Sequence, residues 1–155
     1  MPSPLTETYA RVIVCERTHR WVLAWRGLLG ARQSLLWQTR SLAEAQERLR
    51  EAPASVVALE CPLEKVGELS RWLESVAARF PWMLAVVLAD PPVQVAECVL
   101  RSAGAQQVVY SPLGLPALTR LVVRHLDRVP RPVLPIRQWA WQRMPWSGRL
   151  APQDE

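Results

Sequence analysis

The chain has 155 residues, half of them apolar, which is enough for one domain with a single hydrophobic core. No apolar run approaches the roughly 20 residues that a membrane-spanning helix requires. The first residues also lack the basic and apolar regions of a secretory signal. We therefore expect a cytoplasmic protein.

The net charge of +5 is unevenly distributed along the sequence. Residues 1–126 mix basic and acidic side chains, whereas residues 128–152 carry five arginines and no acidic residue. The sequence therefore places the excess positive charge in the C-terminal segment. Cys15, Cys61 and Cys98 lie far apart without zinc-ligand spacing, and we predict that all three are small buried residues.

Short apolar runs alternate with amphipathic stretches over the first 129 residues, which is typical of an α/β fold with a parallel sheet. The predicted strands are residues 11–15, 34–38, 55–59, 84–88 and 107–110. The predicted helices are residues 18–29, 41–52, 62–80, 93–103 and 115–127. Five such units predict a doubly wound, five-stranded parallel sheet of order 2-1-3-4-5.

Local signals support these helices. Ser41 and Glu44 have the spacing of a capping box, and Gly30 can end the first helix. The first helix has an apolar stripe, formed by Trp21, Ala24, Trp25, Leu28 and Leu29. We predict that this stripe packs in or at the edge of the core.

The chain divides into three predicted segments. Residues 1–10 form an N-terminal extension, and residues 11–129 form the α/β domain. Residues 130–155 form a tail rich in proline, tryptophan and arginine, whose prolines do not fit a regular helix or a central strand.

Ligand binding or chemistry in a doubly wound sheet is expected at the carboxyl ends of the strands. Four strand ends carry chemically informative pairs, namely Cys15-Glu16, Glu60-Cys61, Ala89-Asp90 and Ser111-Pro112. Glu16 and Glu60 fall at adjacent strand ends. The sequence therefore predicts that the two carboxylates share one site.

At these positions the chain resembles the receiver domains of bacterial response regulators, which have a CheY-like, flavodoxin-like fold. In that family the first strand ends in an acidic pair and the third ends in the phospho-accepting Asp. The resemblance covers residues 11 to about 129, and it includes Gly104-Ala105 before the last strand and Ser111-Pro112 after it. It implies a role in signal transduction through protein binding.

The residues at the family's chemical positions differ from the receiver pattern. Cys15 stands at the first acidic position, Glu60 at the acceptor, Ala89 at the Thr or Ser of strand four, and Ser111 at the Lys. Aspartyl phosphorylation needs Mg²⁺ held by several carboxylates and a cation that balances the phosphoryl oxygens. The degenerate pocket consists of Cys15, Glu16, Glu60, Ala89, Ser111 and Pro112, and it supplies neither in full.

We therefore interpret the chain as a degenerate pseudo-receiver that does not depend on phosphorylation and holds no metal. Glu60 either imitates a modified Asp or reflects drift. The bulky segment 16–21 lacks the glycines of a phosphate-binding loop, and His125 has no catalytic partner that the sequence identifies. No cofactor and no enzymatic activity are expected.

The tail carries a basic and aromatic segment that contains Arg137, Trp139, Trp141, Arg143 and Trp146. In an extended conformation the rings of Trp139 and Trp141 point the same way and can fill pockets of a protein partner. Two alternatives remain open. The segment folds back on its own domain, or it forms a nucleic-acid surface by combining stacking with phosphate contacts.

The resemblance also implies pairing of two copies through the fourth helix, fifth strand and fifth helix. The apolar candidates for that face are Val95, Val99, Leu118, Leu121 and Val122. The preferred function is a non-catalytic protein-interaction module in signalling or regulation. The alternative is a nucleic-acid-associated regulator that uses the tail.

Overall fold

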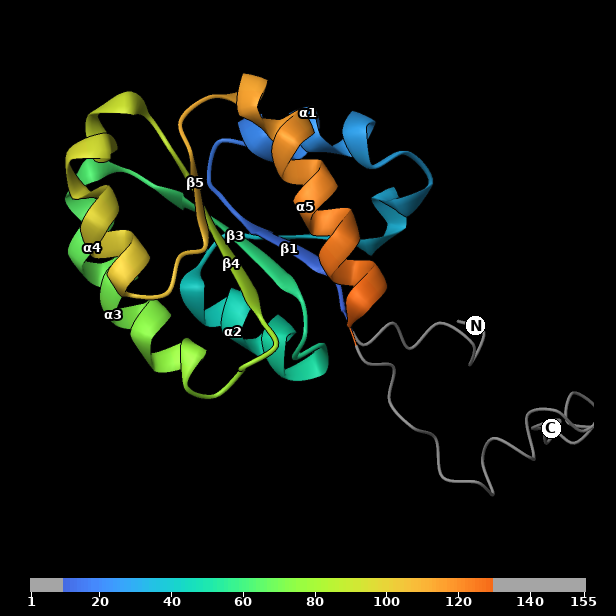
Figure 1. Ribbon diagram of the computed structural model, residues 1–155, viewed down its shortest axis with the longest axis horizontal. Coiled ribbons are helices and arrows are strands. Elements are labelled where there is room, and N and C mark those ends of the chain that lie inside the picture. The colour runs from blue at the N-terminus through green and yellow to red at the C-terminus, as the bar shows by residue number, and fades with distance from the viewer. Residues whose placement is uncertain (1–9, 130–155) are drawn as a thin grey trace, which may run out of the picture.

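The computed structural model describes residues 10–129, which contain a five-stranded parallel sheet flanked by helices (Figure 1). The sheet order is β2-β1-β3-β4-β5, so the predicted order 2-1-3-4-5 is confirmed. The strands are β1 (Val12–Cys15), β2 (Leu36–Thr39), β3 (Val56–Cys61), β4 (Leu84–Ala89) and β5 (Gln107–Val109).

The helices lie in two layers. Helices α1 and α5 cover one face of the sheet, and α2, α3 and α4 cover the other (Figure 1). Their bounds are α1 (Arg20–Leu29), α2 (Leu42–Glu51), α3 (Val66–Ala77), α4 (Glu97–Ser102) and α5 (Leu115–Arg128). Short 3₁₀ helices occupy Gly30–Leu35, Leu63–Lys65, Pro91–Ala96 and Pro112–Gly114.

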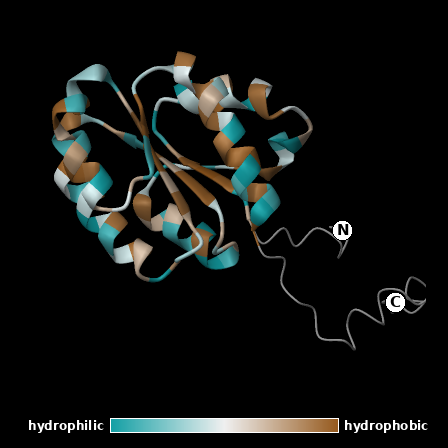
Figure 2. Ribbon diagram, in the orientation of Figure 1, coloured by the Kyte–Doolittle hydropathy of each residue, from teal (hydrophilic) through white to brown (hydrophobic). Residues whose placement is uncertain are grey.

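Alternating side chains of the strands divide the core between the two faces. Val12 and Val14 pack with the α1 and α5 side, whereas Ile13 packs with the side covered by α2, α3 and α4. Figure 2 shows the resulting apolar strands between helices whose outer surfaces are more hydrophilic. Both faces of the sheet are therefore covered by residues within the domain.

The predicted stripe of α1 is correct for its tryptophans and wrong for Leu28. Trp21 and Trp25 are fully buried, but Leu28 is 42% exposed and Val22 takes a buried place instead. Leu28 follows Val22 by six residues, about 120° around the helix, so it turns to the flank when Val22 faces the core. Gly30 ends α1 with a φ of 53°, a conformation that favours glycine.

The prediction of three buried cysteines is also wrong at one position. Cys15 and Cys61 are buried in the sheet, whereas Cys98 is exposed on α4. The physical reason is that α4 is short and directs Leu100 into the core, so the side chain of Cys98 faces outward. Between residues 10 and 129 no helix combines the length and hydropathy needed to span a membrane.

Candidate functional site

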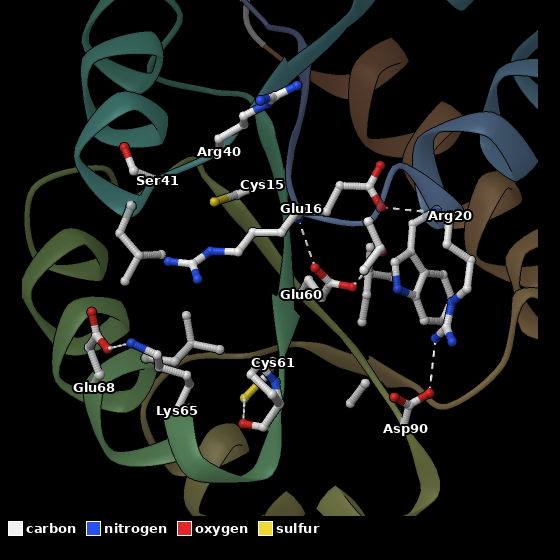
Figure 3. Close-up of a pocket in the computed structure, with 18 of the residues that line it drawn as sticks. Cys15, Glu16, Arg20, Arg40, Ser41, Glu60, Cys61, Lys65, Glu68 and Asp90 are labelled. Atoms are coloured by element: carbon white, nitrogen blue, oxygen red, sulfur yellow. Dashed lines mark hydrogen bonds and ion pairs between the residues drawn. The ribbon is translucent and has the colours of Figure 1, made fainter.

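A cavity of about 470 Å³ lies at the carboxyl edge of the sheet (Figure 3). Its walls come from the ends of β1, β3 and β4, the start of α1, and the loops that precede α2 and α3. Of the predicted pocket residues, Cys15, Glu16, Glu60 and Ala89 line this cavity. Glu16 and Glu60 therefore line the same cavity.

Ser111 and Pro112 do not line this cavity, although they follow β5 at the same edge of the sheet. The Ser111 hydroxyl accepts a hydrogen bond from the backbone N–H of Leu113 at 3.2 Å. This bond begins the short 3₁₀ helix before α5. The serine side chain is thus used to shape its own loop.

Glu16 caps the start of α1. Its side chain is buried, with 2% of the residue exposed, and its two carboxylate oxygens accept the backbone N–H groups of Trp21 at 2.9 Å and Val22 at 2.8 Å. The first N–H groups of a helix have no partner within the helix, and the partial positive charge there favours a carboxylate. Figure 3 shows the Glu16 side chain directed toward the start of α1, close to Arg20.

Glu60 fixes the loop that follows β1. One carboxylate oxygen accepts the backbone N–H of Arg17 at 2.9 Å, and the other accepts the hydroxyl of Thr18 at 2.8 Å. Because Glu60 lies on β3, these two bonds tie the β1–α1 loop to the neighbouring strand. Both oxygens of both glutamates therefore have donors within the chain.

The Mg²⁺ that a receiver-like fold implies does not fit these residues. Mg²⁺ requires hard oxygen ligands in near-octahedral geometry. The carboxylates of Glu16 and Glu60 already accept hydrogen bonds on each oxygen, and Cys15 offers sulfur in place of a carboxylate. Burial raises the pKa of the Cys15 thiol, which keeps it neutral. The arrangement serves to hold the loop rather than to bind a divalent cation.

Sequence reasoning missed the cations that line the cavity, namely Arg17, Arg20, Arg40 and Lys65. Arg20 pairs with Asp90 at 3.0 Å, and the Lys65 ammonium pairs with Glu68 at 2.9 Å. The pair with Lys65 lowers the pKa of Glu68. Their positions in the sequence could have indicated this, because these residues lie in or next to the loops after β1, β2 and β3, which are at the carboxyl edge of the sheet.

His19 lies in the β1–α1 loop and has a left-handed backbone conformation, with a φ of 57°. Its Nε2 lies 3.3 Å from the guanidinium of Arg40, which can only donate a hydrogen bond. Its Nδ1 lies 2.6 Å from the side-chain nitrogen Nε2 of Gln38. These contacts from the end of β2 hold the uncommon backbone conformation in place.

Burial removes several of the predicted residues from the pairing face. Leu118 and Val122 belong to the core and Leu121 is half-buried, whereas Val95 is 86% and Val99 is 53% exposed. Nearby, the Tyr110 hydroxyl donates to Glu97 at 2.6 Å. Desolvation and this bond raise the pKa of Tyr110 to about 12, and the same bond lowers the pKa of Glu97.

The predicted partner-binding residues of the tail lie outside the described residues; they are Arg137, Trp139, Trp141, Arg143 and Trp146.

Comparison with known proteins finds similarity at the level of structure. No family model matches the chain, and no curated protein matches its sequence. A CheY-like protein, TadZ, from Pseudomonas aeruginosa superposes with a TM-score of 0.61 at 18% identity, covering 74% of this chain and 98% of that one.

Two further solved structures are equally similar. A response regulator from Thermotoga maritima matches with a TM-score of 0.61 at 18% identity, over 76% of this chain and 98% of that chain. A protein described as pilus assembly-related from Burkholderia pseudomallei matches with a TM-score of 0.61 at 16% identity, over 84% of this chain and 98% of that chain. The chain therefore has the CheY-like receiver fold.

Proposed function

We propose that this receiver-like domain is a non-catalytic, phosphorylation-independent module that binds proteins in signalling or regulation, and that its tail docks on the domain itself or on a partner. The proposal rests on one observation. The carboxylates of Glu16 and Glu60 at the carboxyl edge are both used to fix the β1–α1 loop. These four hydrogen bonds hold the loop against β3 and the start of α1.

Phosphorylation switches a loop by adding charge and new acceptor oxygens that cations and hydroxyls can reach. At this edge Ala89 has no hydroxyl, and the Ser111 hydroxyl accepts a bond from its own loop. Glu60 supplies a carboxylate that is already hydrogen-bonded. We infer that Glu60 maintains a constant binding surface, which is the role of a fixed mimic rather than of a switch.

The exposed apolar side chains of the α4 and β5 side support a role in protein binding. Val95 and Val99 expose most of their surface. Exposed apolar groups of this kind mark interaction sites when they lie together. We propose that this face binds a protein partner, including a second copy of the chain.

The proposal that the domain functions without phosphorylation is tested by titrating the full chain with beryllofluoride and Mg²⁺ and recording its amide NMR spectrum. We expect the amide resonances to stay unchanged, because both glutamates keep their internal donors. Saturable shifts of the amides around Glu16 and Glu60 would contradict the proposal. Glu60→Gln should abolish any such shift, whereas Glu74→Gln on the exposed side of α3 serves as the matched control.

The pairing proposal is tested by light scattering of the full chain at several concentrations. We expect self-association that Val95→Glu with Val99→Glu abolishes. Leu23→Glu, a change of the same kind at an exposed position of α1, should leave the measured mass unchanged. A native chain that remains monomeric throughout would show that the apolar face does not pair copies of this protein.

A further inference from the structure

Charge is separated between the two layers of the fold. Residues 17–35 and 112–129, which form α1, α5 and their loops, carry seven arginines and a single acidic residue. The remaining described residues carry eight basic and ten acidic side chains. The prediction that the excess charge lies in the tail is therefore incomplete, because one layer of the domain itself is strongly basic.

The outward face of α5 presents the most regular part of this charge. Arg120, Arg124 and Arg128 are exposed and recur every four residues, which spaces them by about 6 Å along the helix. Their guanidinium groups make no hydrogen bond or ion pair with the described part of the chain. Asp127 on the same helix is already paired with Arg32 at 2.9 Å.

These arginines line a shallow groove on α5. Together with Thr119, Val123 and Asp127 they border an open space of about 460 Å³ along the surface of the helix. An open, linear row of guanidinium groups suits an extended anion better than a small one, since each guanidinium can bind one phosphate through two parallel N–H donors. The ligand chemistry indicated by this surface is a chain of phosphates.

A lipid surface fits α5 less well. The apolar residues Leu115, Leu118 and Val122 are buried against the sheet, so the helix has no apolar face left to enter a bilayer. The chain continues from α5 into a sequence that contains Arg131, Arg137, Arg143 and Arg149 together with three tryptophans. Proteins that bind single-stranded nucleic acid combine such arginines, which contact phosphates, with aromatic rings, which stack on bases.

We propose that the Arg120, Arg124 and Arg128 face of α5 binds the phosphate backbone of single-stranded nucleic acid. This inference goes beyond protein binding at the α4 and β5 side, and it uses the opposite layer of the fold.

Fluorescence anisotropy of the full chain with a labelled 20-nucleotide oligothymidine, between 50 and 200 mM salt, tests the proposal. We expect binding that weakens steeply as salt rises. Arg120→Gln with Arg124→Gln should weaken binding about tenfold at 50 mM salt and reduce the slope of log affinity against log salt by about 1.4, since each lost phosphate contact removes about 0.7. Arg71→Gln with Arg79→Gln, two exposed arginines of the other layer, should change neither quantity.

Absence of binding at 50 mM salt, or an equal loss in both double variants, would overturn the proposal. Tighter binding of a 20-residue polyglutamate or of phosphatidylserine vesicles would overturn it too, and would assign the face to an acidic protein or to a membrane. Arg124→Gln alone, checked by thermal melting, keeps the test decisive if the double variant does not fold. The beryllofluoride titration involves none of these arginines, so the two proposals fail separately.

Discussion

Glu16 stands where a receiver has a metal-binding acid, but its contacts are those of a helix cap. Replacing it with Gln keeps one acceptor and turns an N–H₂ group toward the second backbone N–H of α1. We expect Glu16→Gln to lower the free energy of unfolding by about 2 kcal/mol, because a buried, charge-assisted hydrogen bond and a favourable interaction with the helix dipole are lost. Urea unfolding followed by circular dichroism measures this change.

Glu74→Gln is the matched control, since Glu74 is an exposed residue of α3. Its free energy of unfolding should stay within a few tenths of a kcal/mol of the native value. If both variants lose the same stability, Glu16 has no special role as a cap. If Glu16→Gln is neutral, the two N–H groups of α1 find other partners.

The three thiols should differ sharply in reactivity. Cys98 is exposed, whereas Cys15 and Cys61 are buried, and burial raises the pKa of Cys61 to about 11. The reacting species is the thiolate, so we expect a thiol reagent at pH 8 to modify one cysteine rapidly and the other two only after unfolding. Mass spectrometry of the modified chain counts the sites. Rapid labelling that persists in Cys98→Ser would show that a buried thiol becomes accessible.

At the scale of single residues the sequence predicted which side chains meet but not what they contact. Strand order alone brings Glu16 and Glu60 to one edge, because parallel strands end together. Whether Glu16 turns into the cavity or toward α1 depends on free backbone N–H groups five and six residues ahead, which no residue pattern specifies. The same limit applies to Leu28, whose place on the stripe depends on how α1 is rotated against the sheet.

At the scale of elements, one polar bond joins α1 to α5 inside the apolar layer. Trp25 donates its indole N–H to the Thr119 hydroxyl at 2.9 Å, and that hydroxyl donates to the carbonyl of Leu115 at 2.7 Å. Thr119→Val keeps the shape but leaves the indole N–H buried without an acceptor. We expect a loss of about 1–3 kcal/mol in unfolding free energy.

Thr119→Ser is the informative comparison, because it retains the hydroxyl and removes a methyl group. Thermal melting of the two variants should place Ser close to the native chain and Val clearly below it. The opposite order would mean that the methyl group contributes more than the hydrogen bond. The emission spectrum of the chain would also shift if the environment of Trp25 changes.

The sequence predicted the number, type and order of the elements, because alternating apolar runs and helical stripes are properties of whole segments. It predicted the starts of helices less well. The expected helices 62–80 and 93–103 begin as 3₁₀ turns at Leu63–Lys65 and Pro91–Ala96. Apolar periodicity does not distinguish a tight first turn from a regular one, and the prolines there fit either.

At the scale of the whole molecule, charge is organised by layer and not by position in the chain. The basic segments around α1 and α5 are about 90 residues apart in sequence and adjacent in space (Figure 1). Acidic residues of α2 and α3 lie between them in the chain, so a running count of charge hides the separation. Only the doubly wound topology, which returns α5 to the side of α1, brings these arginines into one layer.

The structure of the described domain also allows a prediction of how removal of the tail changes stability. The helices of the two layers cover both faces of the sheet, so the core is closed by residues 10–129 themselves. We expect a chain that ends at Arg131 to melt within about two degrees of the full chain, a difference that corresponds to well under 1 kcal/mol for a domain of this size. Light scattering on the same samples should show no change in oligomeric state.

A melting temperature lower by several degrees at unchanged oligomeric state would contradict this expectation, and it would select docking of the tail on its own domain over docking on a partner. An unchanged melt leaves Trp139, Trp141 and Trp146 available to another molecule. The nucleic-acid proposal then predicts how the truncated chain binds the oligonucleotide. Binding through α5 should persist in that chain and should still weaken as salt rises, since Arg120, Arg124 and Arg128 remain.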